Sequence, residues 1–94
     1  MDAVRHPVTG VLTFDTVPDW FRQSAGWFAG SGDLLIDLGG VTRADSAGLA
    51  LMLEWLRRAR AANRTLRFAS VPDQVQTLIR INGLQDALSG AQTS

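Results

Sequence analysis

Residues 36–49 read IDLGGVTRADSAGL, in which a strand, a short turn and the start of a helix follow one another. Residues 33–38 form a short apolar run bounded by turn residues, which predicts a central strand buried on both faces. After a loop, Asp45 and Ser46 open a helix, where free backbone N–H groups and the helix dipole favour an anion. This stretch therefore places a hydroxyl group, that of Ser46, at a helix start directly after a strand.

Strands and helices alternate along the rest of the chain. The sequence predicts strands over 8–14, 33–38 and 65–70, and helices over 17–29, 45–62 and 72–82. This order implies an α/β fold with a small mixed or mostly parallel sheet and crossover helices. We expect a single domain over residues 1–88 and a flexible C-terminal tail over 89–94.

Composition removes several classes of function. Nine arginines balance nine acidic residues, so neither a nucleic-acid partner nor an anionic membrane surface is indicated. The chain has no cysteine and one histidine, and His6 is expected to be a solvated residue near the terminus, so we expect no metal and no cofactor. The N-terminus lacks an apolar leader and the longest apolar run is residues 49–53, which predicts a cytoplasmic protein without membrane insertion.

Catalysis is not expected of this chain. A nucleophilic Ser46 would need a nearby base, and the single histidine is distant in sequence and has no orienting partner. Gly39 and Gly40 follow a strand but lack the spacing and the lysine of a phosphate-binding loop. The sequence therefore predicts a protein that acts by binding.

The segment DSAGL at 45–49, with the strand before it, resembles the STAS domain family, which includes bacterial anti-sigma factor antagonists. The segments LALMLEWLRRAR, LRFASVP and LIRINGL, at 49–60, 66–72 and 78–84, are similar to the MlaB type, the STAS subunit of the Mla phospholipid transporter. The resemblance covers about residues 10–88. It implies a non-catalytic subunit of a Gram-negative bacterium that binds the ATPase of a phospholipid-transporting ABC complex, which maintains outer-membrane lipid asymmetry. Such a subunit would associate with the inner membrane and its permease through that ATPase.

The alternative that this resemblance implies is an anti-sigma factor antagonist, in which the hydroxyl aligned with Ser46 is phosphorylated. Read from the residues alone, Asp45 or Ser46 is instead an N-cap, and Gly48 permits close packing of the helix. Both interpretations of Ser46, as a regulatory hydroxyl and as a cap, stay open at this stage.

Helical periodicity indicates which face of residues 45–62 meets a partner. Four apolar side chains share one face and are expected in the core: Leu49, Met52, Leu53 and Leu56. The opposite face carries Ala47, Leu51, Glu54 and Arg58, and a leucine on this polar face suggests an exposed binding patch. With Asp45, Ser46 and Trp55, which lies at the border of the two faces, these residues form the predicted partner interface.

The N-terminus departs from the family pattern. STAS domains normally begin with two strands, whereas few residues precede Thr9 in this chain. Residues 3–6 are expected to form at most a stub that is cut short by Pro7, because proline cannot donate to a sheet ladder. A shortened first strand leaves a sheet edge open, and we expect this edge to favour a homodimer or a tight contact with another chain.

Overall fold

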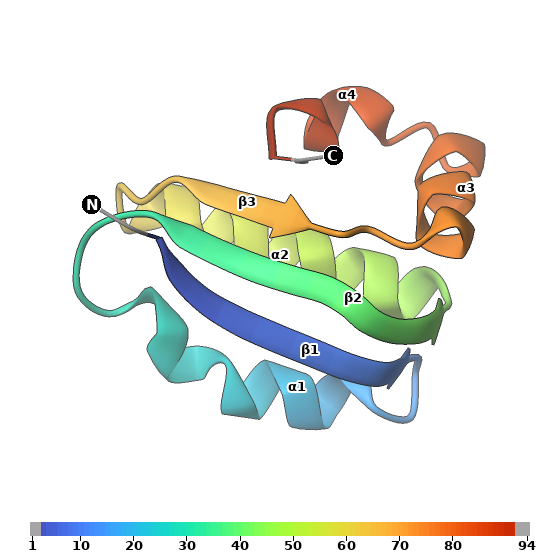
Figure 1. The fold of residues 1–94 in the computed structure, drawn as a ribbon, viewed down its shortest axis with the longest axis horizontal. Helices are drawn as coiled ribbons and strands as arrows, with labels where there is room; N and C mark the ends of the chain where they lie inside the picture. Colours follow the sequence, from blue (N-terminus) through green and yellow to red (C-terminus); the bar gives the residue numbers. More distant parts are fainter. Residues whose placement is uncertain (1–2, 92–94) are drawn as a thin grey trace.

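A computed structural model of the chain describes residues 3–91. Three strands, β1 (Val4–Leu12), β2 (Leu34–Ala44) and β3 (Leu66–Ala69), form a parallel sheet in the order β1-β2-β3 (Figure 1). The helical elements are α1 (Val17–Gln23), the 3-10 turn η1 (Ala25–Phe28), α2 (Ser46–Ala61), α3 (Asp73–Ile81), α4 (Gln85–Leu88) and a second 3-10 turn, η2 (Ser89–Ala91). The predicted α/β fold with a parallel sheet and crossover helices is confirmed.

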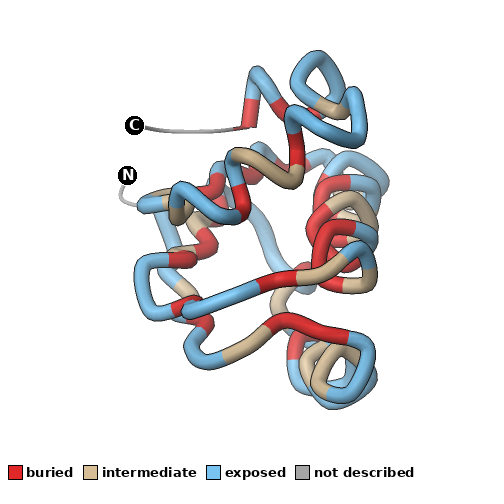
Figure 2. The backbone as a smooth tube through the Cα atoms, turned by 90° about the vertical axis from the view of Figure 1, so that its right-hand side faces the viewer, coloured by how far each residue is buried: buried red, intermediate tan, exposed pale blue. Residues whose placement is uncertain are grey.

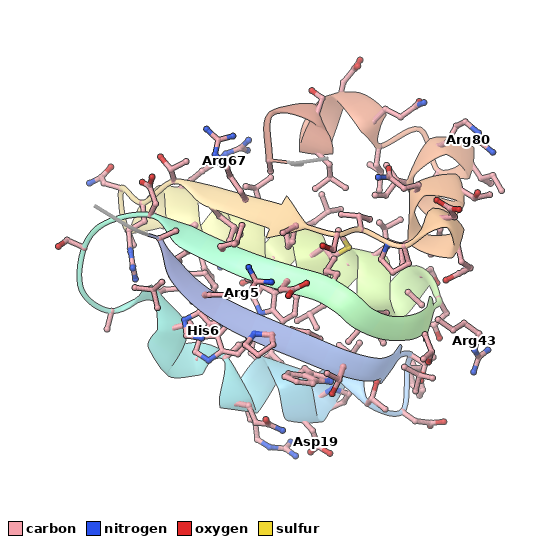
Figure 3. The ribbon with its side chains drawn as sticks, in the orientation of Figure 1. Arg5, His6, Asp19, Arg43, Arg67 and Arg80 are labelled. Atoms are coloured by element: carbon pink, nitrogen blue, oxygen red, sulfur yellow. The ribbon has the colours of Figure 1, made fainter. Side chains whose placement is uncertain are left out.

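Helices α1 and α2 pack on the same face of the sheet, as Figure 2 shows from the side. Along β2 the side chains of Leu34, Ile36 and Leu38 are buried under these helices, whereas Leu35 and Asp37 on the other face are only half-buried. The prediction that this strand is buried on both faces is therefore wrong. On the open face Arg5 of β1 forms an ion pair with Asp37 (Figure 3).

Strand β2 is longer than the sequence indicates. The segment expected as a loop, residues 39–44, continues the strand because β1 extends far enough to pair with it, from Thr9 opposite Gly40 to Leu12 opposite Ala44. Two register shifts between these strands accommodate extra residues of β2. As a result, β2 delivers the chain directly to Asp45, and the helix begins one residue later.

A single strand precedes α1. It was expected to be cut short at Pro7, but β1 continues through this residue. The backbone N–H of Val4 donates to Asp33 of the chain segment leading into β2, at 3.0 Å, so the alternation of the strand turns the nitrogen of Pro7 toward the outer edge. Proline therefore removes no bond from the β1–β2 ladder. Within residues 3–91 the outer edge of β1 has no strand beside it, and the expected homodimer at this edge stays a prediction.

Two helical regions differ from the expected bounds: the end of the first helix and the segment after α4. The first helix changes to a 3-10 turn after Gln23, and the buried Ser24 at this change accepts a hydrogen bond of 2.8 Å from Trp55 Nε1. Beyond α4, residues 89–91 form η2, and Ala91 is only 4% exposed. The prediction of a flexible tail from residue 89 is therefore wrong for 89–91, and residues 92–94 lie outside the described residues. Among the described residues no helix is long and apolar enough to cross a lipid bilayer.

Gly48 lies where α2 comes closest to the sheet. A Cβ atom there would be 2.9 Å from Leu12 Cβ and would collide with the carbonyl oxygen of the same residue. We expect Gly48→Ala to lower the free energy of unfolding by about 1–3 kcal/mol, because backbone atoms of β1 cannot yield to the added methyl group. Urea denaturation measures this loss, and Gly90→Ala is the matched control because a Cβ there meets no atom within 4 Å. Equal stability of the two variants would contradict the close packing.

His6 was expected to be a solvated residue, and this prediction is wrong. Its ring is half-buried and stacks on Trp27, with ring centroids 4.3 Å apart and an angle of 10° between the planes. Burial of the ring, and then the positive charge of Arg64, lower the pKa of His6 from its ordinary value of 6.5.

This lowered pKa predicts a loss of stability in mild acid. Below about pH 6.5 the unfolded chain binds a proton that the folded chain does not bind, so the free energy of unfolding falls as the pH decreases through this range. Above pH 6.5 the histidine contributes no slope. Thermal unfolding at pH 7.5 and pH 5.5 should show a lower melting temperature at pH 5.5, and His6→Gln should reduce the difference. Because the chain has no other histidine, an undiminished difference in the variant would contradict this assignment.

Candidate functional site: a groove between α1 and α2

An apolar groove with a volume of about 720 Å³ lies between α1 and α2. One side is formed by α1 and the turn before it, with Phe14, Val17, Pro18 and Phe21. The other side is formed by α2, with Ala47, Ala50, Leu51 and Glu54. Phe14 is 80% exposed and Phe21 is 39% exposed, which is unusual for such large apolar side chains. Apart from Glu54, the lining is apolar, as is typical of a surface that another molecule covers.

Asp45 fixes one end of this groove. Its Oδ1 accepts hydrogen bonds from the backbone N–H groups of Ala47 and Gly48, at 2.9 and 3.2 Å, and so caps α2. Its Oδ2 accepts a bond of 3.0 Å from the N–H of Phe14, which holds the exposed ring beside the start of α2. These bonds, the one from Phe14 first, lower the pKa of Asp45, so the cap stays ionised at neutral pH.

Ser46 is the first residue of α2 and is exposed at the same end. The prediction that Asp45 or Ser46 is the N-cap is confirmed for Asp45, and Ser46 is not the cap. Within residues 3–91 the Ser46 hydroxyl makes no hydrogen bond, so it is available to a partner or to a modifying enzyme. Gln74 of α3 holds Ala44, the last residue of β2, since its side-chain amide oxygen accepts from the N–H of Ala44 at 2.8 Å and its NH2 group donates to the C=O at 2.9 Å.

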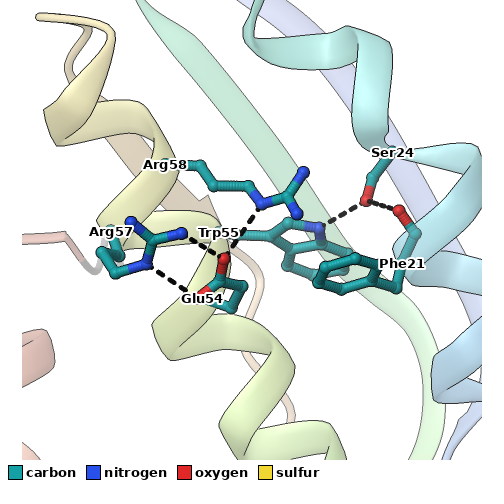
Figure 4. Close-up of polar contacts among 6 residues, drawn as sticks. All are labelled: Phe21, Ser24, Glu54, Trp55, Arg57 and Arg58. Carbon is teal, nitrogen blue, oxygen red and sulfur yellow. Dashed lines mark hydrogen bonds and ion pairs between the residues drawn. The ribbon is translucent and has the colours of Figure 1, made fainter.

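The other end of the groove is charged. Glu54 accepts hydrogen bonds from Arg57 at 2.6 and 2.9 Å and from Arg58 at 3.0 Å, and these bonds lower the pKa of Glu54 to about 2 (Figure 4). The guanidinium carbon of Arg58 also lies 4.3 Å from the ring centroid of Phe21. Arg58 thus bridges from α2 to α1 and closes the groove at this end.

The predicted interface residues divide into two groups. Ser46 is exposed, and Asp45, Ala47, Glu54 and Arg58 are half-buried, with Ala47 and Glu54 in the groove lining. The other two are buried: Leu51, which also lines the groove, is only 2% exposed and Trp55 only 1%, so the prediction of Leu51 as an exposed patch is wrong.

The buried positions of these two residues have a clear cause. Leu51 forms the floor of the groove because α1 packs beside α2 and covers the face that periodicity marked as polar. Trp55 belongs to the core, where its indole bonds Ser24 and its ring lies 5.7 Å from that of Trp27. Trp55, placed by the sequence at the border of the two faces, is thus a core residue.

The sequence reading missed the α1 side of the groove. It placed Phe14 at the end of a strand and Phe21 within the first helix, and it did not single out either ring, although both are exposed. The available signal was the spacing of Phe14, Val17, Pro18 and Phe21, which repeats the spacing of the α2 lining residues.

No group of three or more His, Asp or Glu side chains in the described part of the chain could hold a metal ion.

Comparison with known families agrees with this fold. Residues 3–90 match the family described as MlaB, STAS domain. The chain belongs to this family. STAS domains are generally regulatory or interaction modules rather than enzymes, which fits a site built as an apolar groove. No curated protein matches the chain in a sequence comparison.

Proposed function

We propose that this MlaB-type STAS domain binds the ATPase subunit of a phospholipid-transporting ABC complex in a Gram-negative bacterium and supports that subunit without catalysing a reaction. Through the ATPase it would meet the permease at the cytoplasmic side of the inner membrane. The groove between α1 and α2, with Ser46 at its end, is the surface that would contact the ATPase.

The observation that carries this proposal is the exposure of Phe14 and Phe21 around an apolar groove in a small domain. Exposed aromatic side chains beside a depression are typical of the centres of protein interfaces. The membership in the MlaB-type family supplies the class of partner.

Co-purification tests the proposal. The chain carries an affinity tag and is co-expressed with the ABC ATPase and permease encoded nearest to it in its genome. We expect the ATPase to be retained in a stable stoichiometric complex and the permease to be retained only when the ATPase is present. Absence of the ATPase from the complex would overturn the proposal.

A second candidate is an anti-sigma factor antagonist switched by phosphorylation, which the exposed, unbonded hydroxyl of Ser46 favours. A phosphate on Ser46 would add a charge of about −1.5 to −2 at the start of α2, beside the ionised Asp45. Recovery of a kinase-like anti-sigma factor with the chain, together with phosphate on Ser46 by mass spectrometry, would favour this function over transport.

A further inference from the structure

We infer that the occupant of the groove is an amphipathic helix of the partner that runs antiparallel to α1 and α2, with acidic residues in its first turn and basic residues in its last. This inference rests on the proposed function, because it describes the segment of the ATPase that would bind. It follows from the spacing of the lining residues, the direction of the two helices and the charges at the groove ends.

The lining residues form two matching stripes. Phe14, Val17, Pro18 and Phe21 follow the spacing i, i+3, i+4, i+7, and so do Ala47, Ala50, Leu51 and Glu54. This is the spacing of residues on one side of a helix. Phe14 lies in the turn before α1, which leads into the helix through a bond of 2.9 Å from the Val17 N–H to the Thr13 C=O. Two such stripes side by side leave a furrow that fits the apolar ridge of a third helix.

The small side chains of α2 make this furrow accessible. Ala47 and Ala50 keep the α2 wall low, and Leu51 seals the floor from the core. The rings of Phe14 and Phe21 stand at the two ends of the α1 wall. The seven residues of α1 span about 10 Å, so we expect about two to three turns of the partner helix to contact the groove.

The charges at the two ends have opposite signs. At the Phe14 end lie Asp15, next in sequence, and Asp45, which bonds the Phe14 N–H. At the Phe21 end two arginines, Arg57 and Arg58, surround Glu54. On α1 the neighbouring Asp19 is neutralised by its ion pair with Arg22, so the net charge of this end is positive. A partner that is basic at the first end and acidic at the second is therefore complementary to the groove.

Helix direction gives the orientation of the partner. Helices α1 and α2 both begin at the carboxyl end of the sheet, near Phe14, and run the same way (Figure 1). The C-terminus of a partner helix carries the negative end of its dipole and favours lysine and arginine in its last turn. Placed near the N-termini of α1 and α2, such an end satisfies both the dipoles and the acidic side chains.

Site-directed photo-crosslinking of the co-purified complex tests this inference. Because the chain has no cysteine, Asp15→Cys and Arg57→Cys each give one attachment site for a benzophenone label. We expect both labels to react with one helix of the ATPase, the Asp15 position about 7–11 residues C-terminal to the Arg57 position and beside lysine or arginine. Ile81→Cys, a 74% exposed site on α3, is the control and should give no crosslink to that helix.

Affinity measurements give a second readout. We expect Asp15→Lys and Arg57→Glu each to weaken ATPase binding by about three- to tenfold, since charges at the rim of an interface contribute modestly. Crosslinks to two separate segments, to a strand or in the reverse order would overturn the inference. A stable complex without crosslinks from either label would overturn it while leaving the proposed function intact.

If the ATPase does not bind at all, the proposed function fails and a peptide tests the groove directly. The probe is a 14-residue synthetic helix with Leu and Phe at i, i+3, i+4, i+7, Glu in its first turn and Lys in its last. We expect it to shift the amide signals of Phe14, Ala47 and Ala50 and to bind at least threefold more tightly than the same peptide with its charges exchanged. Absence of these shifts, or equal binding of both peptides, would overturn the inference.

Discussion

Replacement of Arg64 by alanine is expected to lower the free energy of unfolding by about 3–5 kcal/mol, measured by urea denaturation. The residue lies just before β3 and is only 6% exposed. Its guanidinium group donates to four backbone carbonyls of the segment between α1 and β2, those of Trp27, Ala29, Gly32 and Ser31, at 2.8, 2.8, 2.9 and 3.2 Å. Truncation leaves these carbonyls without their donor and removes the link between this segment and β3.

One further variant separates the hydrogen bonds of Arg64 from its charge, and a second is a control. Arg64→Lys keeps the positive charge but cannot reach four carbonyls with one ammonium group, so we expect a loss of about half that of the alanine variant. Arg60→Ala, at an exposed position of α2, should change stability by less than about 0.5 kcal/mol. A loss below 1 kcal/mol for Arg64→Ala would show that the segment does not depend on these bonds.

Much of the fold could be predicted because local patterns agree with it. Turn residues, alternation and helix caps indicated the order of strands and helices, and the left-handed backbone of Asn63 and Gly83 lies where helix ends were expected. The extent of β2 could not be predicted in this way. Its continuation beyond Leu38 depends on pairing with β1, a contact between segments about 30 residues apart.

The site was predicted only from its α2 side. The DSAGL segment marks the helix start, where Asp45 caps α2 and Ser46 is its first residue, and Ala47 lines the groove. Which face of a helix is covered depends on its neighbours, so periodicity within α2 could not show that α1 buries Leu51. The same limit hid Arg64, because its four partners belong to a segment that only the tertiary structure brings near.

Opposite outcomes are expected for glutamate substitutions at Phe14 and Leu51. Phe14 is 80% exposed, so Phe14→Glu should leave the free energy of unfolding within about 0.5 kcal/mol of the parent chain. If the groove binds the ATPase, the same change should weaken binding about 100-fold, because it places a charge where an aromatic anchor would be buried. Leu51 is 2% exposed, so Leu51→Glu should destabilise the fold by about 4 kcal/mol or more.

Measuring both stability and binding for each variant distinguishes the groove from the exposed patch expected from periodicity. An exposed Leu51 would give a folded Leu51→Glu variant that fails to bind, whereas a floor residue gives an unfolded one. Ile81→Glu is the matched control, since Ile81 is 74% exposed on α3 and away from the groove, and both its stability and its binding should be unchanged. Equal binding by the Phe14 and Ile81 variants would place the ATPase contact outside the groove. Weak binding by Phe14→Glu with normal stability would locate the partner contact at this end of the groove, because the bond from the Phe14 backbone N–H to Asp45 does not involve the altered side chain.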